Sequence, residues 1–475
     1  MQCFQIYILD VFSSVLQNSL INGRPPVYTL INRTWCVAAV PLLWRNPWDS
    51  YNFKSLLDVI LSYLSEESRN ILKNQGINNL IAETYQQPLF NYIDFLKYLD
   101  LNFLEKIISS FKIEESKQVI IKNEILKLFC NSNATFIHLS IPRNISNYQL
   151  HLITGAERCL SELEFLHCNV DQNVLKDLAS ICKSIKTLKV DIYYCADNSG
   201  IIKLIEVQKN LHDVGFIGIH YDSSQKKIND ESFYKSLEES LIKHAGTIQY
   251  LKIDWIPITG FLSYLVNLSS LEICNGWNDI NYFENLSSPN LKILNVNQVP
   301  PKILANLVKN TIGQLTEISI SSVDNKMVIQ VIYQNCSKLK YLHLSLANNN
   351  SLADSNLFIL EIENLLVNCQ CLKGLIINTC FAVFRWDQFF MILARSSPVS
   401  LFRFKFIFSG TVKLEDLKLF FDKWEDRNPM LLTINNLQCS KMQMEDLIKQ
   451  YKVRGTIKKC SIDRNFIGYQ NFDWA

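Results

Sequence analysis

The chain has 475 residues, 48% of them hydrophobic and 19% charged, which is the composition of an ordered, core-forming protein and not of a disordered one. Lysine and arginine total 47 against 45 for aspartate and glutamate, and this net charge of +2 offers no basic excess for neutralising nucleic-acid phosphates. With 14 glycines and 12 prolines there is little material for flexible linkers, so we expect a chain folded over nearly its whole length, with no nucleic acid among its partners.

The first 20 residues are apolar, but they contain Asp10 and lack both a basic start and a small-residue cleavage pattern, so we expect no secretory signal. No stretch reaches about 18 uninterrupted apolar residues, and we therefore expect no membrane-spanning helix and no membrane partner. The 14 cysteines include no Cys-x-x-Cys pair and lack the dense spacing of a secreted disulfide framework. These features predict reduced thiols and a cytoplasmic or nuclear protein.

Residues 1–48 are predicted to form a small helical head. One apolar helix face is expected from the spacing of Ile8, Val11, Phe12 and Val15. Residues 30–48 then read Leu-Ile-Asn-Arg-Thr-Trp-Cys-Val-Ala-Ala-Val-Pro-Leu-Leu-Trp-Arg-Asn-Pro-Trp. This run resembles the second half of the F-box, where a Val-x-Arg-x-Trp helix is followed by a short helix that ends in tryptophan. The end of the run looks like the fungal F-box proteins that join such a head to degenerate leucine-rich repeats.

The F-box resemblance implies that the head binds the Skp-type linker subunit of a cullin-based SCF ubiquitin ligase. A helical head of this kind lays its exposed apolar face into a groove of its partner. The residues expected to bind the linker subunit are Ile8, Val11, Phe12, Val15, Leu30, Ile31, Trp35, Val40, Leu43 and Trp44. The chain lacks the Leu-Pro pair with which F-boxes normally open. A second interpretation therefore stays open, in which Trp35, Trp44 and Trp48 are core aromatics of a helical cap.

Residues 49–131 are predicted to form a helical connector that caps the repeats following it. Helical spacing is followed by Leu56, Leu57, Ile60, Leu61 and Leu64. The helical segment is expected to end at Gly76, and further helices are expected over Tyr92–Leu99 and Ser116–Phe129. A cap is expected because the first strand and helix of a stacked array would otherwise expose their apolar faces.

Residues 132–475 contain a recurring pattern of apolar positions, L-x-x-L-x-L. Full copies begin at Leu160, Ile185, Leu211, Ile248, Leu268, Leu291, Leu315, Leu339, Leu372 and Leu401. Weaker half-copies occur at residues 138–141 and 431–434. Most copies start within the leucine-rich range of about 20–29 residues of one another. The last two apolar positions of each copy alternate, so they lie on one face of a short strand.

Helical patterns lie between the copies, and a single strand-plus-helix unit cannot bury its own apolar face, so neighbours must stack. The predicted fold is α/β, a leucine-rich-repeat solenoid with a curved parallel sheet and outer helices, preceded by the F-box-like head and the helical connector. The strand positions between the core residues would form the inner face, on which an unidentified target protein is expected to bind. The residues proposed for that face are Glu164, Lys189, Lys252, Glu272, Asn295, Ser319 and His343.

The cysteines occur at repeat-specific places. Cys182, Cys336 and Cys369 each precede the first apolar residue of a repeat by three positions, and Cys168 and Cys380 each follow one by eight. This arrangement resembles the cysteine-containing leucine-rich repeats of many F-box proteins. We expect these thiols to be small buried fillers.

No phosphate-binding glycine loop, nucleophile elbow or H-E-x-x-H motif is present, so we expect no catalysis, no cofactor and no metal site. Carboxylate pairs such as Glu114-Glu115 and Glu238-Glu239 are expected on solvated helix faces. Two functions follow from these patterns. One is the substrate-recognition adaptor of an SCF-type E3 ubiquitin ligase. The other is a non-catalytic leucine-rich-repeat scaffold whose head only caps the repeats.

Overall fold

The computed structural model of the chain describes residues 33–49, 53–77, 90–111, 113–141, 153–169, 172–192, 199–218, 231–255, 257–274, 288, 290–311, 313–323, 326–346, 352–379, 384–408, 412–435 and 441–463. The α-helices are α2 Arg33–Leu43, α3 Phe53–Ser62, α4 Glu66–Asn74, α5 Leu101–Ser110, α6 Glu115–Asn131, α7 Ala156–Leu160, α8 Gln172–Ile181, α9 Ser199–Glu206, α10 Glu231–Ile242, α11 Pro301–Lys309, α12 Lys326–Asn335, α13 Leu352–Asn368, α14 Trp386–Ser396, α15 Leu414–Lys423 and α16 Lys441–Val453. Short 3-10 helices are η2 Pro47–Asp49, η4 Tyr92–Phe95 and η6 Phe261–Tyr264.

The strands are β1 Tyr98–Asp100, β2 His138–Ile141, β3 Phe165–Cys168, β4 Thr187–Ile192, β5 Asp213–Gly218, β6 Tyr250–Ile253, β7 Ser270–Ile273, β8 Ile293–Asn297, β9 Glu317–Val323, β10 Tyr341–Leu346, β11 Gly374–Asn378, β12 Arg403–Ile407, β13 Met430–Asn435 and β14 Ile457–Asp463. They form a 14-stranded sheet in which the strands follow one another in chain order, and neighbouring strands pair in parallel. The chain forms two compact units, residues 1–214 with 218–229 and residues 215–217 with 230–475.

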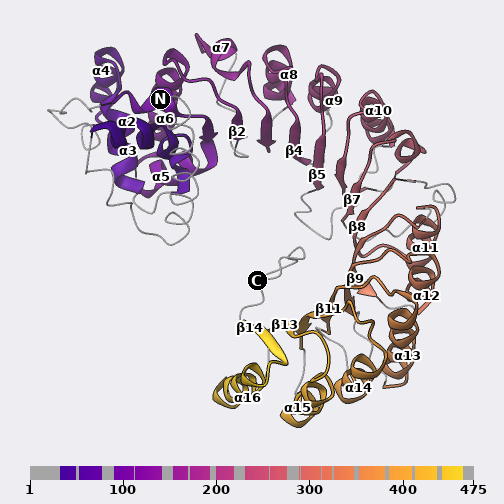
Figure 1. The fold of residues 1–475 in the computed structure, drawn as a ribbon. Coiled ribbons are helices and arrows are strands. Elements are labelled where there is room, and N and C mark those ends of the chain that lie inside the picture. Colours follow the sequence, from indigo (N-terminus) through magenta and orange to yellow (C-terminus); the bar gives the residue numbers. More distant parts are fainter. Residues whose placement is uncertain are drawn as a thin grey trace. The chain divides into compact units, whose positions relative to one another are not determined.

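In each unit the helices lie on one side of the strands of their own repeats (Figure 1). Helices α8 and α9 pack together in the first unit, and α11 to α15 pack pairwise along the second. A parallel sheet with helices between successive strands is the arrangement that stacked leucine-rich units require. The predicted α/β leucine-rich-repeat fold is confirmed.

The core consists of the apolar positions of the repeats. Leu251 and Ile253 on β6 are fully buried, as are Leu271 on β7 and Leu294 on β8. Parallel pairing sets Leu251 beside Leu271, and Leu271 beside Leu294, so the same face of every strand turns toward the helices. Burial of each leucine contributes about 1.5–3 kcal/mol, which is why the pattern survives irregular insertions between the units.

The first full copy of the repeat is in a different register from the predicted one. The predicted copy starts at Leu160 and puts Phe165 in the core, but Phe165 is half-buried, whereas Leu166 and Cys168 are completely buried. Pairing with β4 sets Leu166 beside Leu188. The true copy is therefore Leu163-x-x-Leu166-x-Cys168. The prediction was wrong because this apolar run fits the pattern in two frames, and Cys168 occupies a core position in the one that pairs correctly.

The sheet begins earlier than the sequence pattern indicated. The helix predicted over Tyr92–Leu99 is instead the 3-10 turn η4 followed by β1, which pairs in parallel with β2. The residues Leu96-x-x-Leu99-x-Leu101 are a copy of the repeat that the helical interpretation concealed, and all three leucines are buried. Tertiary pairing outweighs the helical spacing here, since a strand beside β2 satisfies backbone groups that an isolated turn of helix would leave to water.

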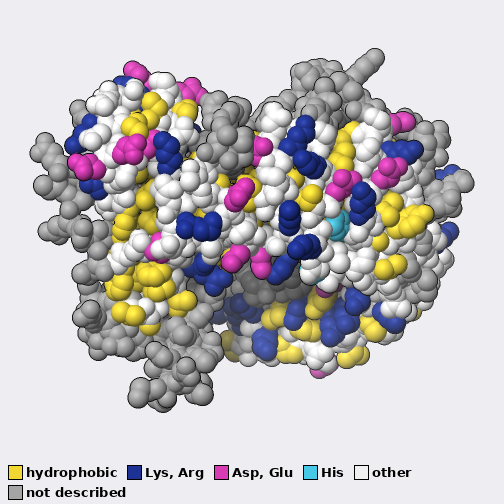
Figure 2. Space-filling view, turned by 90° about the horizontal axis from the view of Figure 1, so that it is seen from above, with side chains coloured by type: hydrophobic (Ala, Val, Ile, Leu, Met, Phe, Trp, Pro, Cys, Tyr) yellow, Lys and Arg dark blue, Asp and Glu magenta, His cyan; other side chains and the backbone are white. Residues whose placement is uncertain are grey.

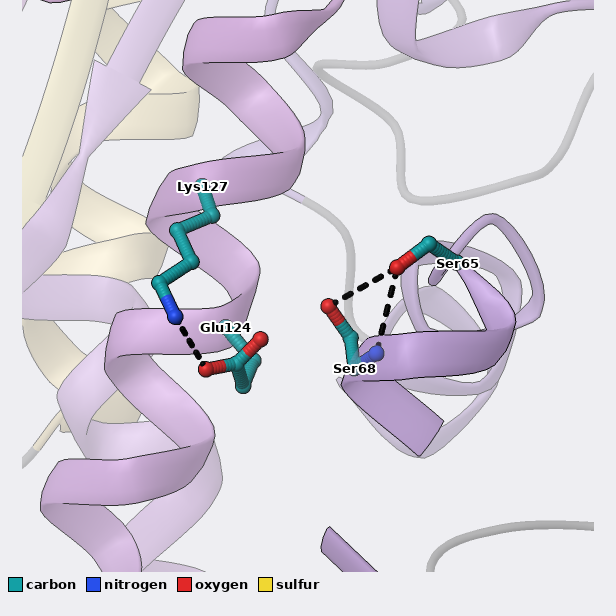
Figure 3. Close-up of polar contacts among 4 residues, drawn as sticks. All are labelled: Ser65, Ser68, Glu124 and Lys127. Carbon is teal, nitrogen blue, oxygen red and sulfur yellow. Dashed lines mark hydrogen bonds and ion pairs between the residues drawn. The ribbon is translucent and has the colours of Figure 1, made fainter. Parts of the chain in front are cut away.

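The connector helices follow the predicted spacing. Leu57 and Ile60 on α3 have no exposed surface, and α6 confirms the helix predicted over Ser116–Phe129. Ser65 caps α4, because its Oγ accepts a hydrogen bond from the Ser68 amide at 3.1 Å. Figure 3 shows this cap beside the pair on α6 in which the Lys127 ammonium donates to the buried Glu124 carboxylate at 2.7 Å.

The repeat cysteines are buried free thiols, as predicted. Cys182, Cys336 and Cys369 have no exposed surface, and burial raises the pKa of each of them to about 12. The Cys369 thiol reaches the carbonyl of Cys336, which belongs to the preceding repeat, at 3.8 Å. These small side chains therefore fill the space between stacked units and are protonated at neutral pH. Cys380 lies outside the described residues.

The carboxylate of Glu238 on α10 was predicted to be solvated, and this prediction was wrong. Its exposed fraction is 0%, and Oε1 accepts hydrogen bonds from the Trp255 indole at 3.0 Å and the Ile258 amide at 2.9 Å. Oε2 accepts from the amide of Thr259 at 2.7 Å and from its hydroxyl at 2.5 Å. Glu239, the next residue, is exposed. Glu238 thus secures the connection between β6 and β7, where no α-helix supplies backbone partners.

Candidate protein-binding surfaces

The structure places part of the predicted linker-binding set. Outside the described residues lie Ile8, Val11, Phe12, Val15, Leu30 and Ile31. Trp35 belongs to α2, but its side chain is outside the description as well. The positions that can be placed in detail are Val40, Leu43 and Trp44.

The end of α2 turns most of these residues inward. Val40 is 8% exposed, Leu43 is half-buried, and the Trp44 ring stacks on Tyr92 with 4.5 Å between ring centroids. These contacts are those of a packed cap. Among the described side chains of α2, the large apolar ones that remain exposed are Val37, at 56%, and Leu42, at 37%. Sequence reasoning did not select either of them, because spacing alone does not reveal which face of a short helix is covered.

Residues 45–48 close the first strand of the sheet. The Arg45 carbonyl accepts hydrogen bonds from the amides of Lys97 at 3.0 Å and Tyr98 at 3.1 Å. The Trp48 indole, only 4% exposed, donates to the Tyr98 carbonyl at 2.7 Å. The Lys97 carbonyl in turn accepts hydrogen bonds from the amides of Ile137 and His138, at the start of the next strand. The Arg45 carbonyl of the head therefore does for β1 what the Lys97 carbonyl does for β2. This segment acts as a cap, because it satisfies a sheet edge that would otherwise be open.

In the second unit the sheet register brings the predicted target-binding residues into one column. This column lies on the inner face, by which we mean the sheet face opposite the helices. Consecutive pairing places side by side, in this order, Lys252, Glu272, Asn295, Ser319, His343, Ile376, Lys405, Thr433 and Ser461. Five predicted residues therefore share one continuous row, and four further members extend it to β14.

The two charged members at the start of this column neutralise each other. The Lys252 ammonium lies 2.6 Å from Glu272 Oε1, and the Tyr250 hydroxyl donates to Glu272 Oε2 at 2.8 Å. Burial alone would raise the pKa of Glu272, but the hydrogen bond and charge of Lys252 outweigh it and hold that pKa below its ordinary value. This part of the inner face is therefore a satisfied, locally neutral network.

His343 is a buried member of the same column. It is 6% exposed, and its Nδ1 lies 2.9 Å from the Ser319 hydroxyl. Its Nε2 is buried and has no hydrogen-bond partner among the described residues. Burial, and secondarily the charge of Lys405, lowers the pKa of His343 to about 4. The imidazole is consequently neutral across the physiological range.

The pKa of His343 predicts a pH-dependent stability. The folded state disfavours protonation down to about pH 4, whereas the unfolded chain protonates this residue near its ordinary pKa of about 6.5. The stabilisation is therefore fully present above about pH 6.5 and is lost as the pH falls toward 4, by up to about 3 kcal/mol. Urea unfolding between about pH 7 and pH 4.5 should show a flatter pH dependence for His343→Gln than for the wild type. Equal slopes for the two proteins would contradict the prediction.

In the first unit the inner face differs from the prediction at one residue. Glu164 precedes β3 and pairs with Lys186 at 2.6 Å, so it is not the counterpart of Lys189. The residue in register with Lys189 is His167. This correction follows from the shifted repeat described above. Glu164 therefore belongs to the exposed turn before the strand, while Lys189 stays on the inner face.

An aromatic column accompanies Lys189 and was not foreseen. The rings of Tyr98 and His138 stack with centroids 4.9 Å apart, and those of His138 and Phe165 stack at 3.9 Å. The Lys189 ammonium lies 5.5 Å from the Phe165 ring centroid. Tyr98, His138 and Phe165 are in register with one another on β1, β2 and β3. Each lies two residues before the inner-face residue of its own strand, so an alignment of the repeats in the correct register would have predicted this aromatic column.

Some other kinds of site are absent from the residues that the structure describes. Among those described, no three His, Cys, Asp or Glu side chains gather as a set that could hold a metal ion. None of the helices described has the length and apolar character needed to cross a membrane. An apolar groove on the helical side is lined by Ile359, Leu360, Met391 and Ile392, with Arg395 and Lys423 at its rim. Over most of the face shown in Figure 2, basic, acidic and hydrophobic side chains are interspersed.

Comparison with known proteins found similar chains among the solved structures. No protein-family model and no curated protein matches the chain. Among solved structures, the leucine-rich repeat-containing protein LegL7 from Legionella pneumophila is similar over 62% of this chain and 88% of its own, with 13% identity and a TM-score of 0.37. A chain of the yeast Rad7 and Elc1 complex is similar over 79% of this chain and 96% of its own, with 14% identity and a TM-score of 0.40. Likenesses this weak carry no functional conclusion, and the leucine-rich-repeat fold rests on the strand order and register of the chain itself.

Proposed function

We propose that this chain is a non-catalytic protein-binding leucine-rich-repeat protein whose inner sheet face holds a target protein. The observation that carries the proposal is the continuous column from Lys252 to Ser461, in which eight of nine residues in register are polar or charged and the other is Ile376. Parallel stacking gives such a column a fixed spacing of about 4.8 Å, which suits an extended segment or a protein surface better than a small ligand.

The finer proposal is that the chain is a substrate adaptor of an SCF-type ubiquitin ligase in the cytoplasm or nucleus. The head would bind the Skp-type linker, and through it the cullin scaffold. Support comes from the F-box resemblance of residues 30–48 and from the exposed Val37 and Leu42 on α2. The chain would then contribute proximity and orientation to the reaction, and no bond-making group of its own.

The alternative is a scaffold without a ligase, in which the head serves only as a cap. The docking of Arg45 and Trp48 on β1 favours this alternative, because it gives the end of the head a structural task. The two roles are compatible in space: α2 contacts the 92–95 turn through Trp44 while Val37 and Leu42 stay exposed. The discriminating residues are therefore those on the exposed part of α2.

A pull-down of the full chain with purified Skp-type linker subunit tests the ligase proposal. We expect the wild type to be retained and the double variant Val37→Asp, Leu42→Asp to bind at least about 30-fold more weakly, as for the loss of an apolar hot spot. The matched control is Val399→Asp, which places the same charge at an exposed valine of the second unit. Failure of well-folded wild-type protein to bind the linker would leave only the scaffold function.

A further inference from the structure

Toward the C-terminal end of the second unit, positive charges lie on the inner face and on the turns that lead into its strands. We call Lys340, Lys373, Arg403, Lys405 and Lys459 the basic patch. Lys340 and Lys373 immediately precede β10 and β11, and the Lys373 amide donates to the Lys340 carbonyl at 2.7 Å. The Lys373 carbonyl accepts from the Arg403 amide at 3.1 Å, so the three residues lie at the starts of three adjacent strands, which are spaced about 4.8 Å apart.

These charges have no ion-pair partners in the part of the chain that the structure describes, although the charge of Lys340 acts on the Glu317 carboxyl. None of the five residues forms an ion pair there, whereas Lys252 and Lys186 elsewhere on the sheet each hold a carboxylate at 2.6 Å. Glu317 stands in register with Tyr341, yet no ion pair joins it to a described residue. Like charges on adjacent strands repel each other and destabilise the sheet. An anionic partner would remove that repulsion.

Arg403 is held in a conformation that keeps donor groups available. It is in register with Gly374, whose missing side chain leaves room for the guanidinium to reach Tyr341 on the strand beyond. Arg403 Nη1 donates to the Tyr341 hydroxyl at 3.3 Å, and the guanidinium carbon lies 5.2 Å from the Phe402 ring centroid. Its Nε is buried, and no residue that the structure describes accepts a hydrogen bond from it. A guanidinium fixed on aromatic rings with an unused donor is suited to a carboxylate.

A second buried atom without a partner lies in the same region. His343 shares its column with Ile376 and Lys405. Its side chain is only 6% exposed, and no polar atom of the described part of the chain pairs with its Nε2. Nδ1 is paired with the Ser319 hydroxyl at 2.9 Å, so Nε2 is the ring nitrogen that lacks a partner among the described residues. Buried polar atoms are nearly always paired in folded proteins. Two buried nitrogen atoms without described partners, in a region of cations that form no ion pair there, point to a missing polar partner.

We propose that the basic patch binds an extended acidic segment, rich in aspartate and glutamate, of the partner protein. This inference rests on the proposed protein-binding function and specifies the chemistry of the target. Four strand spacings separate β10 from β14, about 19 Å, which matches an extended segment of about six residues at 3.3 Å each. A peptide is favoured over nucleic acid because the five cations belong to a chain whose net charge is only +2.

The test is fluorescence anisotropy of the full chain with a labelled peptide of alternating Glu and Asp, about eight residues long. We expect saturable binding that weakens with salt, and no binding of the same peptide with Gln and Asn. The variant Lys373→Glu, Lys405→Glu should lower the affinity at least tenfold. The matched control, Lys235→Glu, Lys302→Glu, changes the net charge equally on exposed positions of α10 and α11 and should bind as the wild type does.

Three outcomes would overturn the inference. One is absence of acidic-peptide binding by folded wild type, and another is equal weakening in the patch and control variants. The third is tighter binding of a single-stranded oligonucleotide of equal charge that is lost in the patch variant, which would make the patch a nucleic-acid site. Circular dichroism melting checks that each variant is folded. The patch variant should still bind the linker subunit. This control distinguishes a failure of the acidic-segment proposal from a failure of the ligase proposal.

Discussion

Replacing Glu238 by alanine is expected to lower the free energy of unfolding by about 3 kcal/mol or more, because four hydrogen-bond donors would lose a charged acceptor inside the protein. The donors are the Trp255 indole, the amides of Ile258 and Thr259, and the Thr259 hydroxyl. No helix follows β6 directly, so these groups have no regular secondary structure to replace the carboxylate. Urea unfolding followed by circular dichroism measures the loss.

The chain supplies a matched control for this prediction in the adjacent residue. Glu239 has the same side chain on the same helix but is exposed, so Glu239→Ala should change the unfolding free energy by no more than about 0.5 kcal/mol. Glu238→Gln is a second informative variant, because its amide has the size of the carboxylate but directs an N–H₂ group at other donors. Equal stability of the Glu238 and Glu239 variants would show that the buried carboxylate has no structural role.

Replacing Trp48 by alanine is expected to cost about 3 to 5 kcal/mol, the usual loss for truncating a buried tryptophan. The indole packs edge-on against Phe103 at 5.9 Å and donates to the Tyr98 carbonyl, so its removal opens the first strand to water. Hydrogen exchange should accelerate at the amides of Lys97 and Tyr98, which donate to the Arg45 carbonyl. Mass spectrometry of deuterium uptake over residues 92–103 measures this effect.

Two further variants test whether the effect of Trp48→Ala comes from the loss of the cap on the first strand. Trp48→Phe keeps most of the apolar contact but loses the indole donor, so it should cost only about 1 to 2 kcal/mol. Trp44→Ala removes a half-buried ring that stacks on Tyr92, and its effect should be smaller than that of Trp48→Ala. If Trp48→Ala leaves exchange at Lys97 and Tyr98 unchanged, the segment does not cap the sheet.

Together these variants distinguish the two tasks of the head. The capping contacts involve Arg45 and Trp48, whereas the surface available to a linker subunit is marked by Val37 and Leu42. A variant of the second pair that loses the linker while keeping its stability would show that binding and capping are separable. Trp44 is unsuitable for that comparison, since its ring is part of the packing against Tyr92.

The sequence by itself determined the repeat architecture, because the signal for it is local and strongly repeated. Leucine-type residues at fixed spacing must share one strand face, and burial of that face then requires a neighbour of the same kind. This reasoning correctly located the core, as Leu271 and Leu294 show, and the burial of Cys336 and Cys369. It also selected Ser319 and His343 as neighbours on the inner face before any pairing was known.

Only the tertiary structure decided the features that depend on contacts between repeats. Leu160 and Leu163 offer two frames of the same pattern, and pairing with β4 chooses between them. Glu238 and Glu239 are chemically identical neighbours, and only the path of the chain after β6 buries the first. Charge matching is equally non-local, because insertions of different length between repeats hide which lysine of one strand meets which carboxylate of the next. Lys252 forms an ion pair with Glu272 on the next strand, whereas Lys373 and Lys405 form no ion pair with a described residue. No local sequence pattern distinguishes the paired lysine from the unpaired ones.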